Sequence, residues 1–178
     1  MIGRAIYRIR QALSMLVATL SPDDSALADR WLSVQERSLF RRMEVADQRH
    51  SVRVARSLLA AGVADSCLIK AALLHDVGKS RRPPGLAYRT AAVLMVRALG
   101  HLPSPLTREC ASGWRLPFRV IANHPDLGAE MLVGAGCEER VCRLVALHQT
   151  DPQQVGDISD RDWVLKALRL LQEADNRS

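Results

Sequence analysis

The sequence is poor in aromatic residues and in lysine, and it has no paired-cysteine motif. Aromatic side chains make up 4% of the 178 residues, and most of the apolar mass comes from Leu, Ala and Val. That mixture favours helices over strands. The scarcity of rings also leaves little on which nucleic-acid bases could stack. Four cysteines without a CxxC pair argue against structural zinc or a disulfide framework, and they predict free thiols in a reducing compartment.

Long uninterrupted apolar runs are missing as well. Arg4, Arg8 and Arg10 interrupt the N-terminal stretch that would have to serve as the apolar part of a signal peptide, and no small-residue cleavage site follows. No stretch approaches the roughly 18 apolar residues that a transmembrane helix needs. Together these absences predict a cytoplasmic protein without a membrane span.

Positive charge is in excess. Lys and Arg number 25 against 19 Asp and Glu, which gives a net charge of +6 at pH 7. A basic balance of this kind fits a phosphate-bearing partner or a nucleic acid. Because the positive residues are scattered along the chain, and because aromatic residues are few, we do not expect nucleic acid to be the main partner.

The spacing of apolar residues predicts an all-α chain, and the family resemblance described below implies two parts, an N-terminal helical extension at residues 1–42 and a helical domain at residues 43–178. Residues 2–20 carry Ile, Leu and Val at steps of three and four, the pattern of an amphipathic helix. We expect this helix to pack on its own domain. A partner-binding helix, which could form a homodimer, and a membrane-surface anchor are the alternatives.

Further helices are predicted along the rest of the chain. The first begins at Ser21-Pro22, where a capping residue precedes a proline, and continues to Met43 with a break before His50. The later helices are expected to end at Gly62, to span 66–76 and 88–99, to end near His124, to span 125–132 and 138–148, and to end at Asp175. Residues 78–84 are predicted as a basic loop, and residues 103–117 as an irregular connection.

Four of the five histidines, and two aspartates, lie at or beside the predicted apolar helices. These residues are His50, His75, Asp76, His124, His148 and Asp175. Imidazoles and carboxylates that emerge from apolar helices need polar partners, and one shared metal site would satisfy all of them. A single histidine at a helix end is more often a partner of the helix dipole or a hydrogen-bonded core residue, so the argument depends on their number.

The order and context of these residues resemble the HD superfamily of metal-dependent phosphohydrolases. That family is all-helical, and its signature is an early His, a His-Asp pair and a late Asp. The matching segments are Arg49-His50-Ser51, Leu73-Leu74-His75-Asp76-Val77-Gly78-Lys79 and Ala174-Asp175. The resemblance covers residues from about 43 to 178, which identifies the second part of the chain as an HD domain.

Two further matches are similar to the dinuclear branch of the family. They are His124-Pro125, followed by Gly128-Ala129, and His148 after an apolar helix. The resemblance implies one metal ion on His50, His75, Asp76 and Asp175, with Asp76 bridging to a second ion that His124 and His148 complete. The expected cofactors are two divalent ions, iron or manganese, although the ligand types also admit zinc, cobalt and nickel.

The activity that this resemblance implies is hydrolysis of a phosphodiester or phosphomonoester, with a nucleotide or dinucleotide as the phosphorylated small molecule. The nucleophile would be a hydroxide that bridges the metal ions. The implied catalytic residues are Asp76 and Lys79, because Lys79 would neutralise charge that develops on the phosphoryl group. Arg81 and Arg82 either extend substrate binding to a second phosphate or belong to a solvated loop.

Two other functions use the same family resemblance. Some HD proteins that resemble inositol oxygenase carry a mixed-valent diiron site on the same six ligands, so an oxygenase is the first alternative. A non-catalytic module that binds a nucleotide is the second, although no ligand is missing here.

Among hydrolases, Ser80-Arg81-Arg82-Pro83-Pro84 replaces the Gly-Tyr-Pro element of cyclic di-GMP phosphodiesterases. His148-Gln149-Thr150 is closer to HD domains that hydrolyse diadenosine polyphosphates or cyclic di-AMP, and both remain open.

Overall fold

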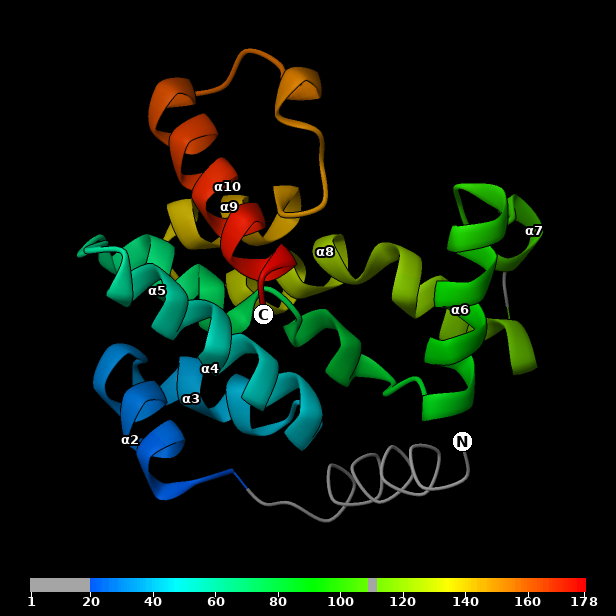
Figure 1. Cartoon of the computed structure of the whole chain (residues 1–178), viewed down its shortest axis with the longest axis horizontal. Coiled ribbons are helices and arrows are strands. Elements are labelled where there is room, and N and C mark those ends of the chain that lie inside the picture. The colour runs from blue at the N-terminus through cyan, green and yellow to red at the C-terminus, as the bar shows by residue number, and fades with distance from the viewer. Residues whose placement is uncertain (1–19, 109–111) are drawn as a thin grey trace, which may run out of the picture.

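Figure 1 shows the computed structural model, which describes residues 20–108 and 112–178. Every regular element in these two ranges is helical, with no strand, so the predicted all-α fold is confirmed. No helix in the described ranges is long and apolar enough to cross a membrane. The predicted helix at residues 2–20 lies outside the described residues except for Leu20.

The helices follow one another in a simple order along the chain. The α-helices are α2 (Pro22–Trp31), α3 (Val34–Arg41), α4 (Val45–Ala60), α5 (Ser66–Leu74), α6 (Leu86–Leu99), α7 (Ser104–Thr107), α8 (Leu116–Gly134), α9 (Glu139–Leu147) and α10 (Arg161–Asn176). Short 3-10 turns are η1 (Val77–Arg81), η2 (Gly113–Arg115) and η3 (Pro152–Gln154).

Helix α5 lies at the centre of the bundle, with α4, α9 and α10 around it and with α2 and α3 also in contact (Figure 1). Seven of its nine residues are buried, as expected for a helix that is covered on nearly all sides. Asp65 caps its first turn by accepting a hydrogen bond from the Leu68 amide at 3.1 Å. The other carboxylate oxygen of Asp65 accepts from Trp163 Nε1 at 2.8 Å, which joins α5 to α10.

The prediction of one long helical stretch up to Met43 is wrong, because α2 and α3 are separated at Leu32 and Ser33. Ser33 and Glu36 form a capping box that begins α3. The Ser33 side chain accepts from the Glu36 amide at 3.3 Å, and the Glu36 carboxylate accepts from the Ser33 amide at 2.7 Å. Apolar residues of α2 and α3 belong to the same core cluster as α5. The boundary between extension and domain at residue 43 stays a prediction.

Helix α8 corrects a second prediction, since two short helices were expected on either side of His124-Pro125. The helix instead runs through Pro125 without interruption. A proline has no amide hydrogen, so Pro125 leaves the carbonyl of Ile121 without its helical donor. The Nδ1 atom of His124 donates to this carbonyl at 2.7 Å. The imidazole therefore occupies an acceptor that the proline leaves free.

The segment after Asp76 was predicted as a loop that begins at Gly78, but residues 77–81 form the 3-10 turn η1. This turn packs against α8 so closely that a Cβ atom at Gly78 would lie 2.0 Å from the His124 carbonyl oxygen. On the facing helix, a Cβ atom at Gly128 would lie 3.2 Å from the Gly78 nitrogen. Glycine at position 78 is what allows the two backbones to meet.

Helices α6 and α7 lie at one end of the molecule, beside the N-terminal half of α8 (Figure 1). Arg89 of α6 connects this end to α4. Its Nη1 and Nη2 atoms donate to the two carboxylate oxygens of Asp47 at 2.6 and 2.8 Å, and Nη2 also donates to Glu44 at 2.6 Å. Its Nε atom donates to the Pro84 carbonyl at 2.8 Å, so the whole guanidinium is engaged.

We expect Gly78→Ala to lower the free energy of unfolding by about 1–3 kcal/mol or more, because the added methyl group would force η1 and α8 apart. The measurement is urea unfolding followed by far-ultraviolet circular dichroism. Gly134→Ala, at the end of α8, is the matched control, since a Cβ atom there meets nothing within 4 Å. Alanine is the better helix former, so this control is expected to keep or gain stability. Equal stability of the two variants would contradict the close approach at Gly78.

Candidate metal centre

The six residues with metal-binding side chains come from five different helices and meet at one place. His50 lies inside α4, and the pair His75-Asp76 directly follows α5. His124 lies inside α8, His148 directly follows α9, and Asp175 lies in the last turn of α10. Since α5 is central, its C-terminal end is the point at which these other elements converge (Figure 1).

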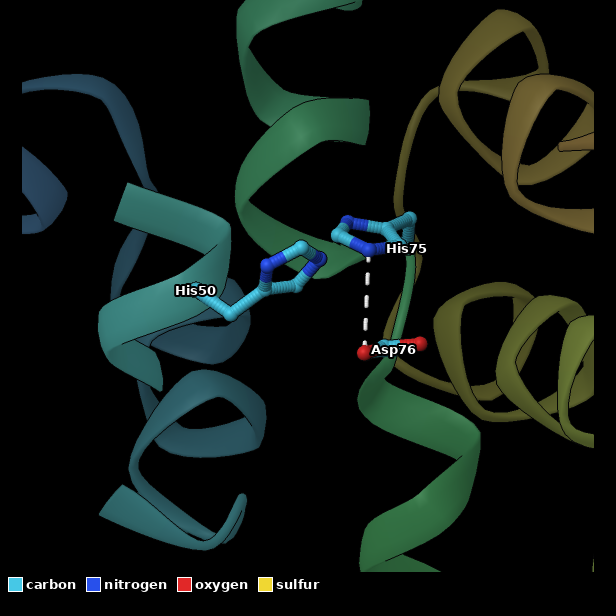
Figure 2. Close-up of side chains that lie close together, drawn as sticks. All are labelled: His50, His75 and Asp76. Carbon is cyan, nitrogen blue, oxygen red and sulfur yellow. Dashed lines mark ion pairs between the residues drawn. The ribbon is translucent and has the colours of Figure 1, made fainter. Parts of the chain in front are cut away.

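The first group of ligand atoms belongs to His50, His75 and Asp76, and all of them lie within 4.8 Å of one another. Figure 2 shows the ring of His50 approaching from α4 toward the ring of His75, with the Asp76 carboxylate beside them. The Nε2 atom of His75 lies 3.7 Å from Asp76 Oδ2. Asp175 borders this group, because its Oδ1 atom lies 2.7 Å from His50 Nε2 and 3.7 Å from His75 Nε2.

The second group consists of Asp76, His124 and His148, whose ligand atoms also lie within 4.8 Å of one another. His124 Nε2 lies 3.2 Å from Asp76 Oδ1 and 3.2 Å from His148 Nε2. All three side chains are buried. Asp76 therefore belongs to both groups and turns a different carboxylate oxygen toward each, Oδ2 toward His75 and Oδ1 toward His124.

The three buried histidines share one orientation, in which Nδ1 donates to the backbone carbonyl three residues earlier. The bonds are His75 to Ala72 at 2.9 Å, His124 to Ile121 at 2.7 Å and His148 to Val145 at 2.7 Å. A carbonyl only accepts, so Nδ1 of each ring carries a hydrogen. Nε2 is then the nitrogen that each ring directs into the cluster, where it can bind a metal ion.

The electrostatics of the cluster favour the protonation states that bind cations. Burial, together with the neighbouring His75 and His124, lowers the pKa of His148 to about 3, so this imidazole is neutral near pH 7. Burial by itself would raise the pKa of Asp76, but His75, His124 and Lys79 together hold it well below its usual range. Neutral imidazole and ionised carboxylate are the forms that coordinate metals. The residues therefore fit divalent ions, and imidazole with carboxylate suits iron, manganese or zinc.

Lys79 lies at the edge of the cluster, one turn after Asp76. Its Nζ atom donates to Asp76 Oδ2 at 2.6 Å. The same side chain lines an adjacent open cavity. Arg81 and Arg82 lie elsewhere, on a second cavity of about 450 Å³ that Lys79 does not line. Arg81 is paired there with Glu130 of α8 at 3.0 Å, and the role of both arginines in substrate binding stays a prediction.

Several supporting residues carried a weak signal or none in the sequence. Pro125 could have been read as the reason that a helical carbonyl is free for His124, because the two residues are adjacent. Gln172 offered no such signal, since it acts between segments that are distant in the chain. Its Nε2 atom donates to the carbonyls of His148 and Thr150 at 3.0 and 2.8 Å, and so fixes the backbone after α9 on α10.

Comparison with known families agrees with this geometry. A family model described as HD domain matches residues 48–178, which includes all six clustered residues. No curated protein and no solved structure matches the chain.

We expect Asp76→Ala to weaken metal binding more than about 100-fold. This loss of affinity exceeds the one usually seen when the removed residue only hydrogen-bonds to a metal ligand. The physical reason is that Asp76 is the one carboxylate that both groups share. Metal content after dialysis, measured by inductively coupled plasma mass spectrometry, checks this. Asp162→Ala removes an exposed carboxylate from the first turn of α10 and is expected to leave the metal content unchanged. Circular dichroism establishes that both variants are folded, and full metal content in folded Asp76→Ala would rule out a shared ligand.

Proposed function

This chain belongs to the HD-domain family, and from that premise we propose that it is a metal-dependent phosphohydrolase with two divalent ions. HD domains are generally metal-dependent hydrolases, so the family supports the reaction class. The observation that carries the proposal is the position of Asp76, whose two oxygens face two separate groups of histidines. One carboxylate between two such groups is the arrangement that a bridging ligand requires.

In this proposal one ion is held by His50, His75 and Asp76, with Asp175 at its edge, and the other by Asp76, His124 and His148. Iron or manganese is the proposed metal, since both accept mixed nitrogen and oxygen ligands. When bound, the ions would supply electrophilic catalysis at phosphorus and lower the pKa of a water molecule. The chain itself contributes the fixed directions of the Nε2 atoms and of both Asp76 oxygens.

Lys79 is proposed as a catalytic residue together with Asp76. Its ammonium group lies 2.6 Å from Asp76 Oδ2, while the rest of its side chain borders an open cavity. A phosphoryl group that reaches the cluster from that cavity would pass beside this positive charge. The ammonium group would then stabilise negative charge that builds up on the phosphoryl oxygens during transfer.

The proposed substrate is a phosphorylated small molecule, and the sequence favours a nucleotide or dinucleotide. A cytoplasmic location and a homodimer formed through the N-terminal segment remain parts of the proposal. A diiron oxygenase would use the same ligand set, so the two enzymes are separated by what the iron-loaded protein consumes. Release of phosphate without oxygen uptake supports the hydrolase, and stoichiometric oxygen uptake supports the oxygenase.

We expect His124→Ala and His148→Ala each to retain one metal ion per chain instead of two, because both imidazoles belong to the second group alone. Hydrolysis of 4-nitrophenyl phosphate should fall at least about 100-fold in both variants, since one electrophile is lost. His101→Ala is the matched control, because His101 is exposed and bonds only to the neighbouring Leu102 carbonyl. If all three variants hold two ions and hydrolyse at the wild-type rate, the dinuclear assignment is wrong.

We expect Lys79→Ala to keep its metal ions, since Lys79 is not a ligand, but to lower kcat by on the order of 10²-fold. Lys79→Arg should restore little, because a planar guanidinium presents its charge at a different reach. Lys166→Ala, in an exposed position on α10, serves as the control for removing one lysine. A wild-type rate of hydrolysis in metal-loaded Lys79→Ala would place Lys79 outside the catalytic machinery.

A further inference from the structure

A cavity of about 330 Å³ opens beside Lys79, between α6 and α8. Its walls are formed mainly by aliphatic side chains, and we call it the α6 pocket. The apolar residues that form most of the wall are Ala92, Val93 and Val96 of α6, Leu102 after it, and Ile121 of α8. At this volume the cavity has room for a small organic group.

The α6 pocket borders the clustered residues at two of its lining residues. Lys79 donates to Asp76 Oδ2, the residue that both groups of ligands share. Ile121 also lines the pocket, and its backbone carbonyl accepts the Nδ1 hydrogen of His124. An ester whose phosphate reaches the cluster therefore has this pocket next to it for its organic group.

Among the described residues that line the α6 pocket, none carries an uncharged hydrogen-bonding side chain. None of them is aromatic either, so a nucleobase finds no ring on which to stack. Two arginines also line the pocket. The guanidinium of Arg89 is already engaged by Asp47, Glu44 and the Pro84 carbonyl, and the exposed Arg97 adds a positive charge that suits the anionic part of a ligand. Ribose hydroxyls placed against these aliphatic side chains would lose their hydrogen bonds to water without replacement.

The same walls leave apolar surface uncovered. Val93 is 57% exposed and Val96 is 44% exposed, although both are large apolar side chains. Covering such surface with an apolar ligand is favourable in proportion to the area removed from water. Lys79 supplies a positive charge at one end of the same cavity. A ligand with an anionic head and an apolar body would match both the charge of Lys79 and the uncovered apolar wall.

We propose that the α6 pocket binds the organic group of the substrate and that this group is apolar, so the substrate is an aryl or alkyl phosphoester and not a nucleotide. This inference rests on the proposed function, because the metal cluster defines where the phosphate lies. It keeps the phosphorylated small molecule of the proposed function, but the chemistry of the pocket walls favours an apolar organic group over the nucleotide that the sequence favours. The pocket contacts the organic group and leaves phosphorus to the cluster and Lys79.

The test uses the metal-loaded full-length protein and non-hydrolysable ligands in isothermal titration calorimetry. Naphthylmethylphosphonate and methylphosphonate carry the same anionic head, but only the first carries an apolar body. We expect the naphthyl ligand to bind at least about tenfold more tightly, and more tightly than adenosine monophosphate, because apolar contacts of this size are worth one to two orders of magnitude.

Two double variants of α6 test whether the preference for the naphthyl ligand comes from the pocket wall. Val93→Gln with Val96→Gln changes the pocket wall and is expected to remove about tenfold of the naphthyl preference, while methylphosphonate affinity stays the same. Leu94→Gln with Leu99→Gln is the matched control, because these residues are 61% and 56% exposed on the same helix but do not line the pocket. This control is expected to keep the wild-type preference.

The possible outcomes test the apolar pocket and the phosphohydrolase activity separately. Equal affinity for the two phosphonates, a preference that survives the pocket variant, or tighter binding of adenosine monophosphate overturns the proposed substrate class. Hydrolysis of 1-naphthyl phosphate is scored separately. Its absence alongside a preference that the pocket variant removes would refute the phosphohydrolase and leave the apolar pocket standing. Hydrolysis of 1-naphthyl phosphate without any such preference would support the phosphohydrolase and refute the apolar pocket.

Discussion

The structure depends on how closely the turn after Asp76 can approach α8. A Cβ atom at Gly78 would lie 2.0 Å from the His124 carbonyl oxygen, so only glycine permits the observed contact. Asp76 directly precedes this turn, two residues before Gly78, and its Oδ1 atom lies 3.2 Å from His124 Nε2. If η1 were displaced from α8, Asp76 would face the histidines of one group only. A backbone contact of this kind therefore determines whether one carboxylate can serve two groups of imidazoles.

The fold uses one hydrogen-bond pattern to aim three imidazole rings. His75 and His148 directly follow α5 and α9, where the last helical turn has carbonyls that lack helical donors. His124 lies inside α8, where all carbonyls would ordinarily be engaged, and Pro125 frees the one at Ile121. In each case Nδ1 is held by the backbone and Nε2 is directed at the cluster. The helix ends and the proline thus fix the directions of these three rings without any contribution from an ion.

The position of α6 places an apolar pocket beside the clustered residues. Arg89 holds this helix against α4 through Asp47, which is 5% exposed. A buried charge that lost its partner would be costly, so the pair opposes movement of α6 away from Lys79. The α6 pocket that results is apolar on most of its walls and cationic at the end next to Asp76. The pocket lies between α6 and α8, while the guanidinium of Arg89 holds α6 to α4.

Local signals in the sequence determined the helical class, most helix ends and the identity of the six clustered residues. Capping and apolar spacing act within a few residues, and the His-Asp pair is read directly from the chain. The Ser33–Glu36 capping box was readable in the same way, although one long helix was predicted there. Only the tertiary structure decided that α8 continues through Pro125, that Gly78 meets α8, and that the Asp76 oxygens face different groups. The last two depend on contacts between segments far apart in the chain, and the first depends on a side-chain hydrogen bond from His124 to the Ile121 carbonyl; local periodicity carries no information about either.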